Sequence, residues 1–593
     1  MAEFMTGLKR THYCADLSLE DINKKVTLCG WVQRQRDLGQ LIFIDLRDRT
    51  GIIQLAFDSG KTDSRVFEKS FSIRNEFVIA AVGNVRERTS KNKDIKTGDI
   101  EIEVTELRVL SQAETPPFEI IDQLGTNEEL RLKYRYLDLR RKPLQDNIMQ
   151  RSKIAKIARD YFYENGFIEI ETPMMIKSTP EGARDYLVPS RIHKGKFYAL
   201  PQSPQIYKQL LMLAGFDRYI QLARCFRDED LRADRQPEFT QIDMELSFVD
   251  VDDIIEINEG LFIRLFKDIL NIDLPSRFER MTYNQAMETY GSDKPDIRFD
   301  MHIKDISETV LATEFKVFTD PIKQGGSVRG ITAKNAADKL TRKEIDKLTE
   351  YVKGIGAKGL AYMRWTDEKP TCSFGRFVTD EQLESIVSLL QLEKGDVAFI
   401  VADTTDIVLS VLGSLRLTVA KKLDIIPNEF KFLWIVDFPF FEYNTEEGEY
   451  AAMHHPFTMV TEDTLKYLDS DLSKVMAKAY DLTLNGVELS SGSIRITDYK
   501  LQQKMFKILK LTEEEIEAKF GFLVEAYKYG APPHGGMGIG LDRIAMLFCG
   551  ADNLRDVTAF PKVQNASELM SKCPSPVDEG SLEMLGLKIK ESS

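Results

Sequence analysis

The stretch from Tyr219 to Phe248 constrains the fold most, because two alternating runs flank a short charged loop. In the second run one set of alternate positions is mainly apolar and the other is polar: Thr240, Ile242, Met244, Leu246 and Phe248 against Gln241, Asp243, Glu245 and Ser247. This period of two predicts a hairpin with a half-buried antiparallel strand. A solvated polar face is the ordinary outcome for such a hairpin. Here the loop places Arg227 beside Asp228, Glu229 and Asp230, which favours a site for an anion and a cation together.

Length and composition indicate a multidomain globular protein. At 593 residues the chain should form three or four domains, and its 43% hydrophobic and 29% charged content is typical of soluble proteins. No apolar run reaches the roughly 18 residues of a membrane span, and the N-terminus has no secretory-type segment. Six scattered cysteines argue against disulfides or zinc. We therefore expect a cytoplasmic protein without a membrane partner.

Charge narrows the choice of partners. The net charge of −14 opposes non-specific attraction to nucleic acid. Two confined basic segments nevertheless stand out, 33–37 with Arg47 and Arg49, and 131–142. An acidic protein with local basic patches suits a specific, releasable RNA partner better than a general binder.

Residues 23–110 read as five short strands, with a helix near 64–72 between the third and the fourth. This is the order of an OB-fold barrel, a fold that binds single-stranded nucleic acid by aromatic stacking and cationic grooves. Phe43 lies on an otherwise aliphatic strand near Arg36, and Gln54 lies on the next strand. A single aromatic in a strand is most often a core residue, so the pattern leaves both roles open for Phe43.

Several further patterns follow along the chain. Pro116 and Pro117 mark a boundary. A helix is predicted over 147–165 with a stop at Gly166, and another begins near Ser203, with Gln205 and Lys208 on one face. Near the C-terminus, four glycines would let a flat ligand approach the backbone closely: Gly535, Gly536, Gly538 and Gly540.

These patterns resemble the class II aminoacyl-tRNA synthetases, in particular the bacterial-type aspartyl enzymes. The hairpin resembles motif 2, the helix and strand ending at Pro173 resemble motif 1, and PPHGGMGIGLDR resembles motif 3. GAKGLAY at 356–362 resembles the GAD-type domain inserted in these enzymes. The resemblance implies an α/β (α+β) protein in six parts: an OB-fold anticodon-binding domain (1–112), a hinge (113–142), a catalytic antiparallel-sheet domain in two parts (143–283 and 425–565), an inserted α+β domain (284–424) and a C-terminal extension (566–593).

The resemblance implies an aspartate–tRNA ligase that is a homodimer. Such an enzyme uses ATP and Mg²⁺ to form aspartyl-adenylate and pyrophosphate, then transfers aspartate to the 3′ end of tRNA-Asp. The attacking carboxylate is already ionised at neutral pH. The site must therefore align the reactants and neutralise charge at phosphorus, rather than supply a base.

The same resemblance assigns roles to individual residues. Arg227 and Arg543 would be catalytic and hold the phosphates. Aspartate would be bound by Glu181, Ser203, Gln205, Lys208, Arg227, Asp243, His454 and Arg495. ATP would be bound by Arg227, Asp228, Glu229, Gln236, Glu488, Gly540, Leu541, Asp542 and Arg543. Magnesium would be held by Asp481 and Glu488, the anticodon would be read by Arg36, Leu38, Phe43 and Gln54, and Pro173 would lie in the dimer interface.

Charge favours aspartate as the substrate, because a buried carboxylate needs cations and Lys208 with Arg495 supplies two. Glu488 and Arg495 have opposite strand parity, so we expect a bulge at Ser490–Gly492 to restore their facing. Two alternatives are an asparaginyl enzyme, whose pocket would tolerate one cation, and a non-catalytic tRNA-binding paralogue. Whether tRNA-Asn is also charged stays open, although Leu38 resembles the residue of the enzymes that charge tRNA-Asp alone.

Overall fold

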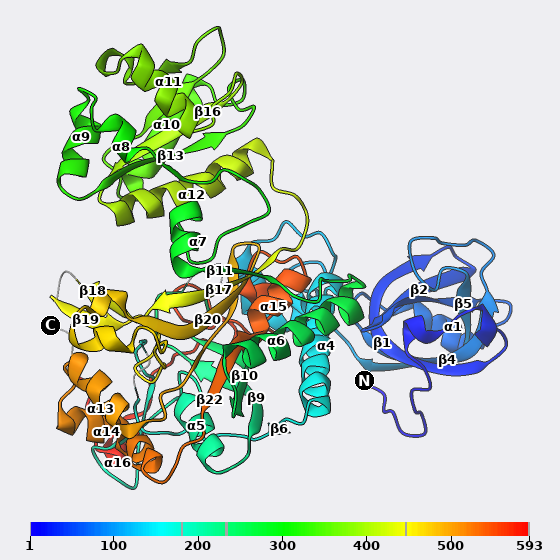
Figure 1. The fold of residues 1–593 in the computed structure, drawn as a ribbon. Coiled ribbons are helices and arrows are strands. Elements are labelled where there is room, and N and C mark those ends of the chain that lie inside the picture. Colours follow the sequence, from blue (N-terminus) through cyan, green and yellow to red (C-terminus); the bar gives the residue numbers. More distant parts are fainter. Residues whose placement is uncertain (1, 180–181, 232–234, 445–447, 591–593) are drawn as a thin grey trace. The chain divides into compact units, whose positions relative to one another are not determined.

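The structure is a computed structural model that describes residues 2–179, 182–231, 235–444 and 448–590 (Figure 1). The chain forms two compact units. The first contains 1–152, 231–236 and 545–576, and the second contains 153–230, 237–544 and 577–593. Among the described residues, no helix combines the length and the apolarity needed to cross a bilayer.

The first unit begins with the expected five-stranded closed barrel, in the order β1-β2-β3-β5-β4. Its elements are β1 (Lys25–Asp37), β2 (Leu41–Asp48), β3 (Gly51–Asp58), α1 (Ser64–Phe71), β4 (Val78–Glu87) and β5 (Ile100–Ser111). Alternation in β2 turns Ile42, Ile44 and Leu46 into the core and leaves Phe43 half-buried on the other face. The OB-fold prediction is confirmed.

The hinge follows as two short helices, α2 (Glu128–Lys133) and α3 (Arg135–Asp138), and leads into α4 (Lys142–Glu164). α4 starts five residues earlier than expected, because Pro143 occupies the first turn, where a missing N–H costs nothing. Gly166, with a φ of +78°, ends this region as predicted.

The second unit is built on an eight-stranded sheet in the order β11-β17-β20-β21-β22-β10-β9-β6. Its strands are β6 (Ile168–Glu169), β9 (Arg218–Phe226), β10 (Glu238–Ser247), β11 (Glu279–Thr282), β17 (Phe432–Pro439), β20 (Met476–Leu484), β21 (Val487–Ile494) and β22 (His534–Gly540). The two edge strands, β6 and β11, pair parallel with their neighbours, and the six central strands pair antiparallel.

The remaining elements of this sheet domain are α5 (Gln205–Leu213), α6 (Val251–Leu265), α7 (Tyr283–Tyr290), α13 (Tyr499–Ile508), α14 (Glu513–Tyr527), α15 (Leu541–Phe548), which continues into the first unit, and α16 (Glu579–Leu585). Two small hairpins pair β7 (Leu187–Pro189) with β8 (Phe197–Ala199), and β18 (Phe441–Asn444) with β19 (Glu449–Ala452).

The inserted segment folds around its own five-stranded sheet, in the order β12-β13-β16-β14-β15. Its elements are β12 (Lys304–Asp305), α8 (Ser307–Val310), α9 (Lys316–Lys323), β13 (Ser327–Ala333), α10 (Arg342–Gly354), β14 (Ala361–Arg364), β15 (Thr371–Cys372), α11 (Asp380–Leu389), β16 (Val397–Asp403) and α12 (Thr405–Leu423). One apolar cluster of this segment includes residues of α10 and α12, and another includes residues of α8, α9 and α11. The segment is thus an α+β domain, as expected.

Two local predictions need correction. β10 is buried on both faces, because Asp243 and Glu245 are as inaccessible as Ile242 and Met244. The prediction of a half-buried strand was therefore wrong. The bulge in β21 exists, but it falls at Leu489, since Leu482 pairs with Ser490 while Thr483 pairs with Glu488.

Candidate functional site

The polar face of β10 lies in a buried cluster of four charges. The Lys208 ammonium on α5 lies 3.0 Å and 3.1 Å from the two carboxylate oxygens of Asp243, and 3.3 Å from Glu245. Arg495, just beyond β21, donates to both oxygens of Glu245 at 2.9 Å and 3.1 Å. All four side chains are almost inaccessible to solvent, so the two cations and two carboxylates compensate one another.

Arg495 is oriented by its own strand as well as by Glu245. Its Nη1 donates to the Ser493 hydroxyl at 2.6 Å, and the Thr458 hydroxyl donates to the same Ser493 oxygen at 3.2 Å. Three of the five guanidinium N–H donors are therefore accounted for by Glu245 and Ser493. The remaining donors give Arg495 the capacity to bind a further carboxylate.

The pKa values of the two carboxylates, Asp243 and Glu245, are shifted in opposite directions. Burial raises the pKa of Asp243 to about 6, although the neighbouring Lys208 partly opposes this. Burial would also raise the pKa of Glu245, but the charges of Arg495 and Lys208 outweigh it and hold that pKa at about 2. Glu245 is thus a permanent anion, whereas Asp243 can gain a proton in mildly acidic solution.

Gly536 on β22 makes room for this cluster. A Cβ atom on Gly536 would lie 1.9 Å from the Glu245 Oε2 atom and 2.2 Å from the Met244 carbonyl oxygen. Gly538 similarly faces the Gln241 side chain, with its hypothetical Cβ at 3.2 Å. At these two positions, glycine accommodates the polar side chains of β10 rather than the expected flat ligand.

The paired histidines occupy different environments. His454 packs edge-on against Phe438, and its Nε2 lies 3.7 Å from the Asp481 carboxylate. For His455, removal from water and the positive charges of Arg495 and Lys208 lower the pKa to about 3. His455 therefore stays neutral at physiological pH.

A second polar group combines Asp481 on β20, Glu488 on β21 and Arg543 on α15. The Arg543 Nη1 donates to the Glu488 carbonyl at 2.9 Å and lies 3.8 Å from its carboxylate. Burial and the charge of Asp481 raise the pKa of Glu488. The buried Oδ1 of Asp481 has no hydrogen-bond partner among the residues that the structure describes. A divalent cation would relieve this repulsion, so the two carboxylates fit the expected Mg²⁺.

Arg227 lies at the end of β9. Its guanidinium carbon is 5.1 Å from the centre of the Phe239 ring, and its backbone N–H donates to the Pro237 carbonyl at 2.9 Å. The buried Nε of Arg227 lacks a hydrogen-bond partner within the described parts of the chain. Asp228 pairs through the backbone with Arg184, and Glu229 is half-buried.

Most of the other expected ligands lie near the start of α5 or near the start of α15. Ser203 lies beside the start of α5 and accepts from the Gln205 N–H at 3.3 Å, while the Gln205 side chain is buried. Asp542 is structural at least in part, because it accepts from the Thr240 N–H at 2.9 Å. Gly540 ends β22 and Leu541, which is buried, begins α15. Glu181 lies outside the described residues.

In the first unit, three of the four expected anticodon residues gather on one face of the barrel. Arg36 lies 6.0 Å from the Phe43 ring centre and donates to Asp45 and Gln54 at 2.7 Å and 2.9 Å. Leu38 lies in the turn between β1 and β2 and is 69% exposed. Gln236, a further expected ATP ligand, binds the Lys562 backbone through both ends of its amide.

The sequence patterns missed several residues of these groups. Glu245 shares strand parity with Asp243, and that signal could have identified it. Ser493 and His455 carry no local signal of their own. Gln202 was also missed, although it donates to the Ala183 carbonyl at 2.8 Å and accepts from the Ala183 N–H at 3.1 Å.

Comparison with known proteins decides the family. The family model described as tRNA synthetases class II (D, K and N) matches residues 127–564. The chain belongs to this family. A second model, the OB-fold nucleic acid binding domain, matches residues 26–110 of this class II synthetase.

Full-length relatives agree with this membership. An aspartate–tRNA ligase from Ruminiclostridium cellulolyticum is 56% identical over 99% of the chain and 100% of its own length. An aspartate–tRNA(Asp/Asn) ligase from Lachnoclostridium phytofermentans is 53% identical, with both chains covered completely.

Solved structures show the shared fold. An aspartyl-tRNA synthetase from Entamoeba histolytica matches with a TM-score of 0.58 at 22% identity, covering 94% of this chain and 92% of that one. An asparaginyl-tRNA synthetase from Pyrococcus horikoshii, complexed with asparaginyl-adenylate, gives a TM-score of 0.57 at 17% identity, covering 93% of this chain and 98% of that one.

Proposed function

We propose that this synthetase is an aspartate–tRNA ligase. It activates L-aspartate with ATP and then transfers aspartate to the 3′ end of tRNA-Asp. The observation that carries this proposal is the buried cluster of Lys208, Asp243, Glu245 and Arg495, to which an anionic amino-acid side chain can add. A relative named aspartate–tRNA ligase, 56% identical over almost the whole chain, supports the same substrate.

In this proposal, Arg495 and Lys208 bind the side-chain carboxylate of aspartate. Arg495 keeps donors beyond those used by Glu245 and Ser493, and its planar fork suits bidentate binding of a carboxylate. Asp243 offers a negative charge to the substrate ammonium group, with Glu181, Ser203, Gln205 and His454 as further ligands. The nearby Glu245 carboxylate holds the Lys208 ammonium and the Arg495 guanidinium in place, and both cations can still bind the substrate carboxylate.

ATP binds so that its α-phosphate lies against Arg227 and its γ-phosphate against Arg543. The buried Arg227 Nε supports this role, since it lacks a partner among the described residues and can donate to a phosphate oxygen. Asp481 and Glu488 would hold Mg²⁺, which neutralises phosphate charge when bound. The remaining contacts come from Asp228, Glu229, Gln236, Gly540, Leu541 and Asp542.

Two nucleophilic attacks complete the reaction. The aspartate α-carboxylate attacks the α-phosphorus, and pyrophosphate leaves. A hydroxyl of the terminal tRNA ribose then attacks the aspartyl-adenylate, and AMP leaves. Arg227 stabilises the charge that develops on the phosphorus centre, so this chain supplies alignment and electrostatic stabilisation rather than a general base.

Aspartate charging of two transcripts tests the proposal. The tRNA-Asp transcript should be charged, whereas one carrying the Asn anticodon should be charged at least about tenfold more slowly, which corresponds to about 1.4 kcal/mol. This expectation rests on Arg36, Phe43 and Gln54 as readers of the anticodon and on the exposed Leu38 beside them. Failure to charge either transcript, together with no aspartate-dependent pyrophosphate exchange, would favour a non-catalytic paralogue.

A second candidate is a ligase that charges both tRNA-Asp and tRNA-Asn. The relatives from Lachnoclostridium phytofermentans and Caldanaerobacter subterraneus, 53% and 54% identical, are named aspartate–tRNA(Asp/Asn) ligases. Comparable charging of the two transcripts would select this candidate and show that Leu38 does not determine discrimination.

Aspartate binding should depend on the protonation of Asp243. As the pH falls through about 6, Asp243 loses its charge while Glu245, with a pKa of about 2, keeps its own. Lys208 and the substrate ammonium then both lose the negative charge of Asp243. We expect KM for aspartate in pyrophosphate exchange to rise roughly fourfold between pH 7.5 and 5.5.

The variant Asp243→Asn is the control for this pH dependence, because its side chain cannot titrate. It should have a raised KM that stays flat over the same pH range. An unchanged pH profile in Asp243→Asn would show that another group titrates.

We also propose that the enzyme is a homodimer and acts in the cytoplasm, where tRNA is charged. Large apolar side chains are exposed near the sheet edge that carries β6 and Pro173. Among them, Tyr163 near the end of α4 is 74% exposed and Ile168 on β6 is 47% exposed. A second copy would cover such a surface. A monomeric mass by light scattering at micromolar concentration would contradict this proposal.

A further inference from the structure

A buried carboxylate, Glu76, connects the barrel to the hinge within the first unit. It accepts from the Arg47 guanidinium through both oxygens at 2.9 Å, and from the Arg140 Nη1 at 2.9 Å. Arg47 shares β2 and its half-buried face with Phe43 and Asp45. The Arg140 guanidinium also lies 5.1 Å from the Trp31 ring centre. The ion pairs from Arg47 through Glu76 to Arg140 thus connect the barrel face that carries Arg36 and Gln54 with the hinge.

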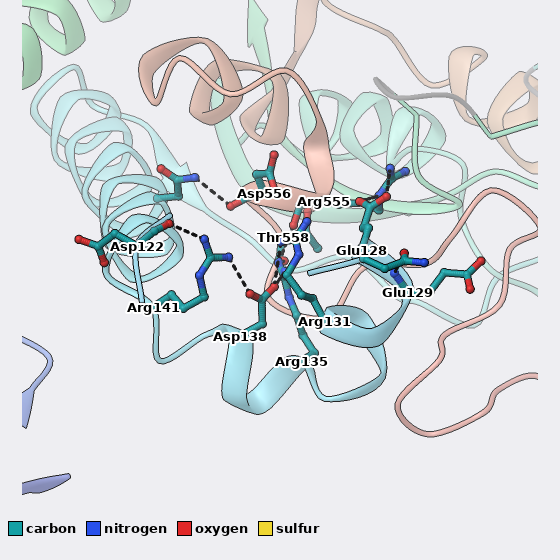
Figure 2. Close-up of polar contacts among 12 residues, drawn as sticks. Asp122, Glu128, Glu129, Arg131, Arg135, Asp138, Arg141, Arg555, Asp556 and Thr558 are labelled. Carbon is teal, nitrogen blue, oxygen red and sulfur yellow. Dashed lines mark hydrogen bonds and ion pairs between the residues drawn. The ribbon is translucent and has the colours of Figure 1, made fainter. Parts of the chain in front are cut away.

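The hinge is fixed internally by a second buried carboxylate, Asp138 (Figure 2). Arg141, next to Arg140, donates to Asp138 at 2.8 Å and to the carbonyls of Ile121 and Asp122. Arg135 donates to the other oxygen of Asp138 at 2.9 Å, and Arg131 approaches that oxygen at 3.4 Å. Asp138 is completely inaccessible to solvent. Removing one of these partners would therefore leave a buried charge poorly compensated.

Arg135 carries the connection to a distant part of the chain. Its Nη2 donates to the carbonyls of Arg555 and Thr558 at 2.6 Å and 2.9 Å (Figure 2). Its Nε donates to the Ala559 carbonyl at 2.9 Å. The Arg135 guanidinium therefore binds three carbonyls of the segment after α15, and Asp138 orients it. A lysine, with one compact ammonium, cannot reproduce this fork.

The segment held by Arg135 leads directly to Gln236. The Lys562 N–H donates to the Gln236 side-chain oxygen at 2.9 Å, and the Gln236 amide donates to the Lys562 carbonyl at 3.1 Å. Gln236 is buried, so both polar ends of its amide depend on the path of the 559–562 backbone. Pro237, the next residue, accepts the hydrogen bond of the Arg227 N–H.

We propose that Arg135 is a positioning residue that, through residues 555–562, holds Gln236 in the geometry needed for aminoacyl transfer, and that Glu76 and Asp138 make this positioning respond to tRNA bound on the barrel face. The inference rests on the proposed tRNA charging. The buried charges of Glu76, Asp138 and Arg135 would connect the barrel to Gln236. Coupling of this kind is a difference in free energy between states, so it is measurable as a ratio of rates.

The test is Arg135→Lys in the full-length protein, with two transcripts that differ only in the anticodon. For the unmodified protein, the changed anticodon should lower kcat for charging at saturating transcript. In Arg135→Lys, kcat on the cognate transcript should fall about tenfold, within the usual range for allosteric coupling. The ratio of kcat between the two transcripts should approach one. Because Gln236 is also a proposed ATP contact, KM for ATP in pyrophosphate exchange without tRNA should rise, whereas the exchange rate at saturating ATP should stay within about twofold.

Matched variants separate coupling from simple destabilisation. Glu128→Ala removes the neighbouring ion pair to the Arg555 side chain, whose distances are 2.8 Å and 3.1 Å, and leaves the Arg555 carbonyl in place (Figure 2). It should behave like the unmodified protein, because Glu128 is exposed. Glu76→Gln, at the barrel end of the path, should reproduce the lowered kcat ratio and serves as the test if Arg135→Lys does not fold.

Three results would overturn the inference. One is an equal loss of charging and of pyrophosphate exchange at saturating ATP in both variants, which indicates a purely structural role. Another is an unchanged kcat ratio between transcripts. The third is an anticodon change that alters only KM in the unmodified protein. A protein that charges no transcript would instead contradict the proposed function and is distinguished by the unmodified control.

Discussion

Replacing Arg495 with leucine is expected to lower kcat/KM for aspartate in ATP–pyrophosphate exchange about a thousandfold. The substitution removes the guanidinium that would bind the substrate carboxylate and also leaves Glu245 with Lys208 as its remaining cation, at 3.3 Å. Loss of one partner of a buried hydrogen-bonded charge pair costs about 2–5 kcal/mol, and about 4 kcal/mol corresponds to this factor.

A matched control is Arg264→Leu, the same substitution in a surface ion pair with Glu164. Exposed pairs contribute little, so exchange activity should be nearly unchanged. If Arg495→Leu retained activity within tenfold of the unmodified protein, Arg495 would not be the principal ligand of the substrate carboxylate. The double variant Glu245→Gln with Arg495→Leu should recover stability but not aspartate activation, because it removes the uncompensated charge without restoring a cation.

Gly536→Ala should have the second largest effect. The new methyl group would lie 1.9 Å from the Glu245 carboxylate and 2.2 Å from the Met244 carbonyl, so either β10 or the carboxylate must move. We expect destabilisation of about 3 kcal/mol, at the upper end of ordinary overpacking. Because Glu245 holds both Lys208 and Arg495, aspartate-dependent exchange should fall at least about a hundredfold, as for other misplaced binding groups.

Gly359→Ala is the control for a glycine that is not constrained, since nothing lies within 4 Å of its hypothetical Cβ. Thermal unfolding and exchange activity would be measured for both variants. A fully active and stable Gly536→Ala protein would show that β22 can shift away from β10 and that the close approach is not required.

Local periodicity was sufficient for the barrel and for the hairpin of β9 and β10. In β2 and β10 the alternation of side chains correctly assigned residues to faces. It could not reveal that Asp243 and Glu245 are buried, because the cations that cover them come from Lys208, earlier in the chain, and from Arg495, 250 residues beyond Glu245. Burial of a strand face depends on long-range packing, which a local pattern does not contain.

Long-range packing also explains why the roles of the glycine-rich strand β22 and of the hinge differ from those predicted. Glycines at 536 and 538 indicated close approach, but the approaching group is a side chain of the neighbouring strand. The basic segment 131–142 was interpreted by charge alone as a patch for RNA. Arg135 and Arg141 instead turn inward to Asp138, since their partners include a buried carboxylate and backbone carbonyls.

The contacts of Arg135 also set an order of events during synthesis. The barrel is continuous in sequence and can close early, whereas Arg135 must wait for the Arg555 carbonyl, 420 residues later. At ordinary translation speeds this interval is roughly 20–80 s. Throughout it Arg135 has none of its three carbonyl partners, and a truncated chain that ends before residue 545 never provides them. The hinge therefore reaches its final form only after the ribosome has synthesised residues 555–559.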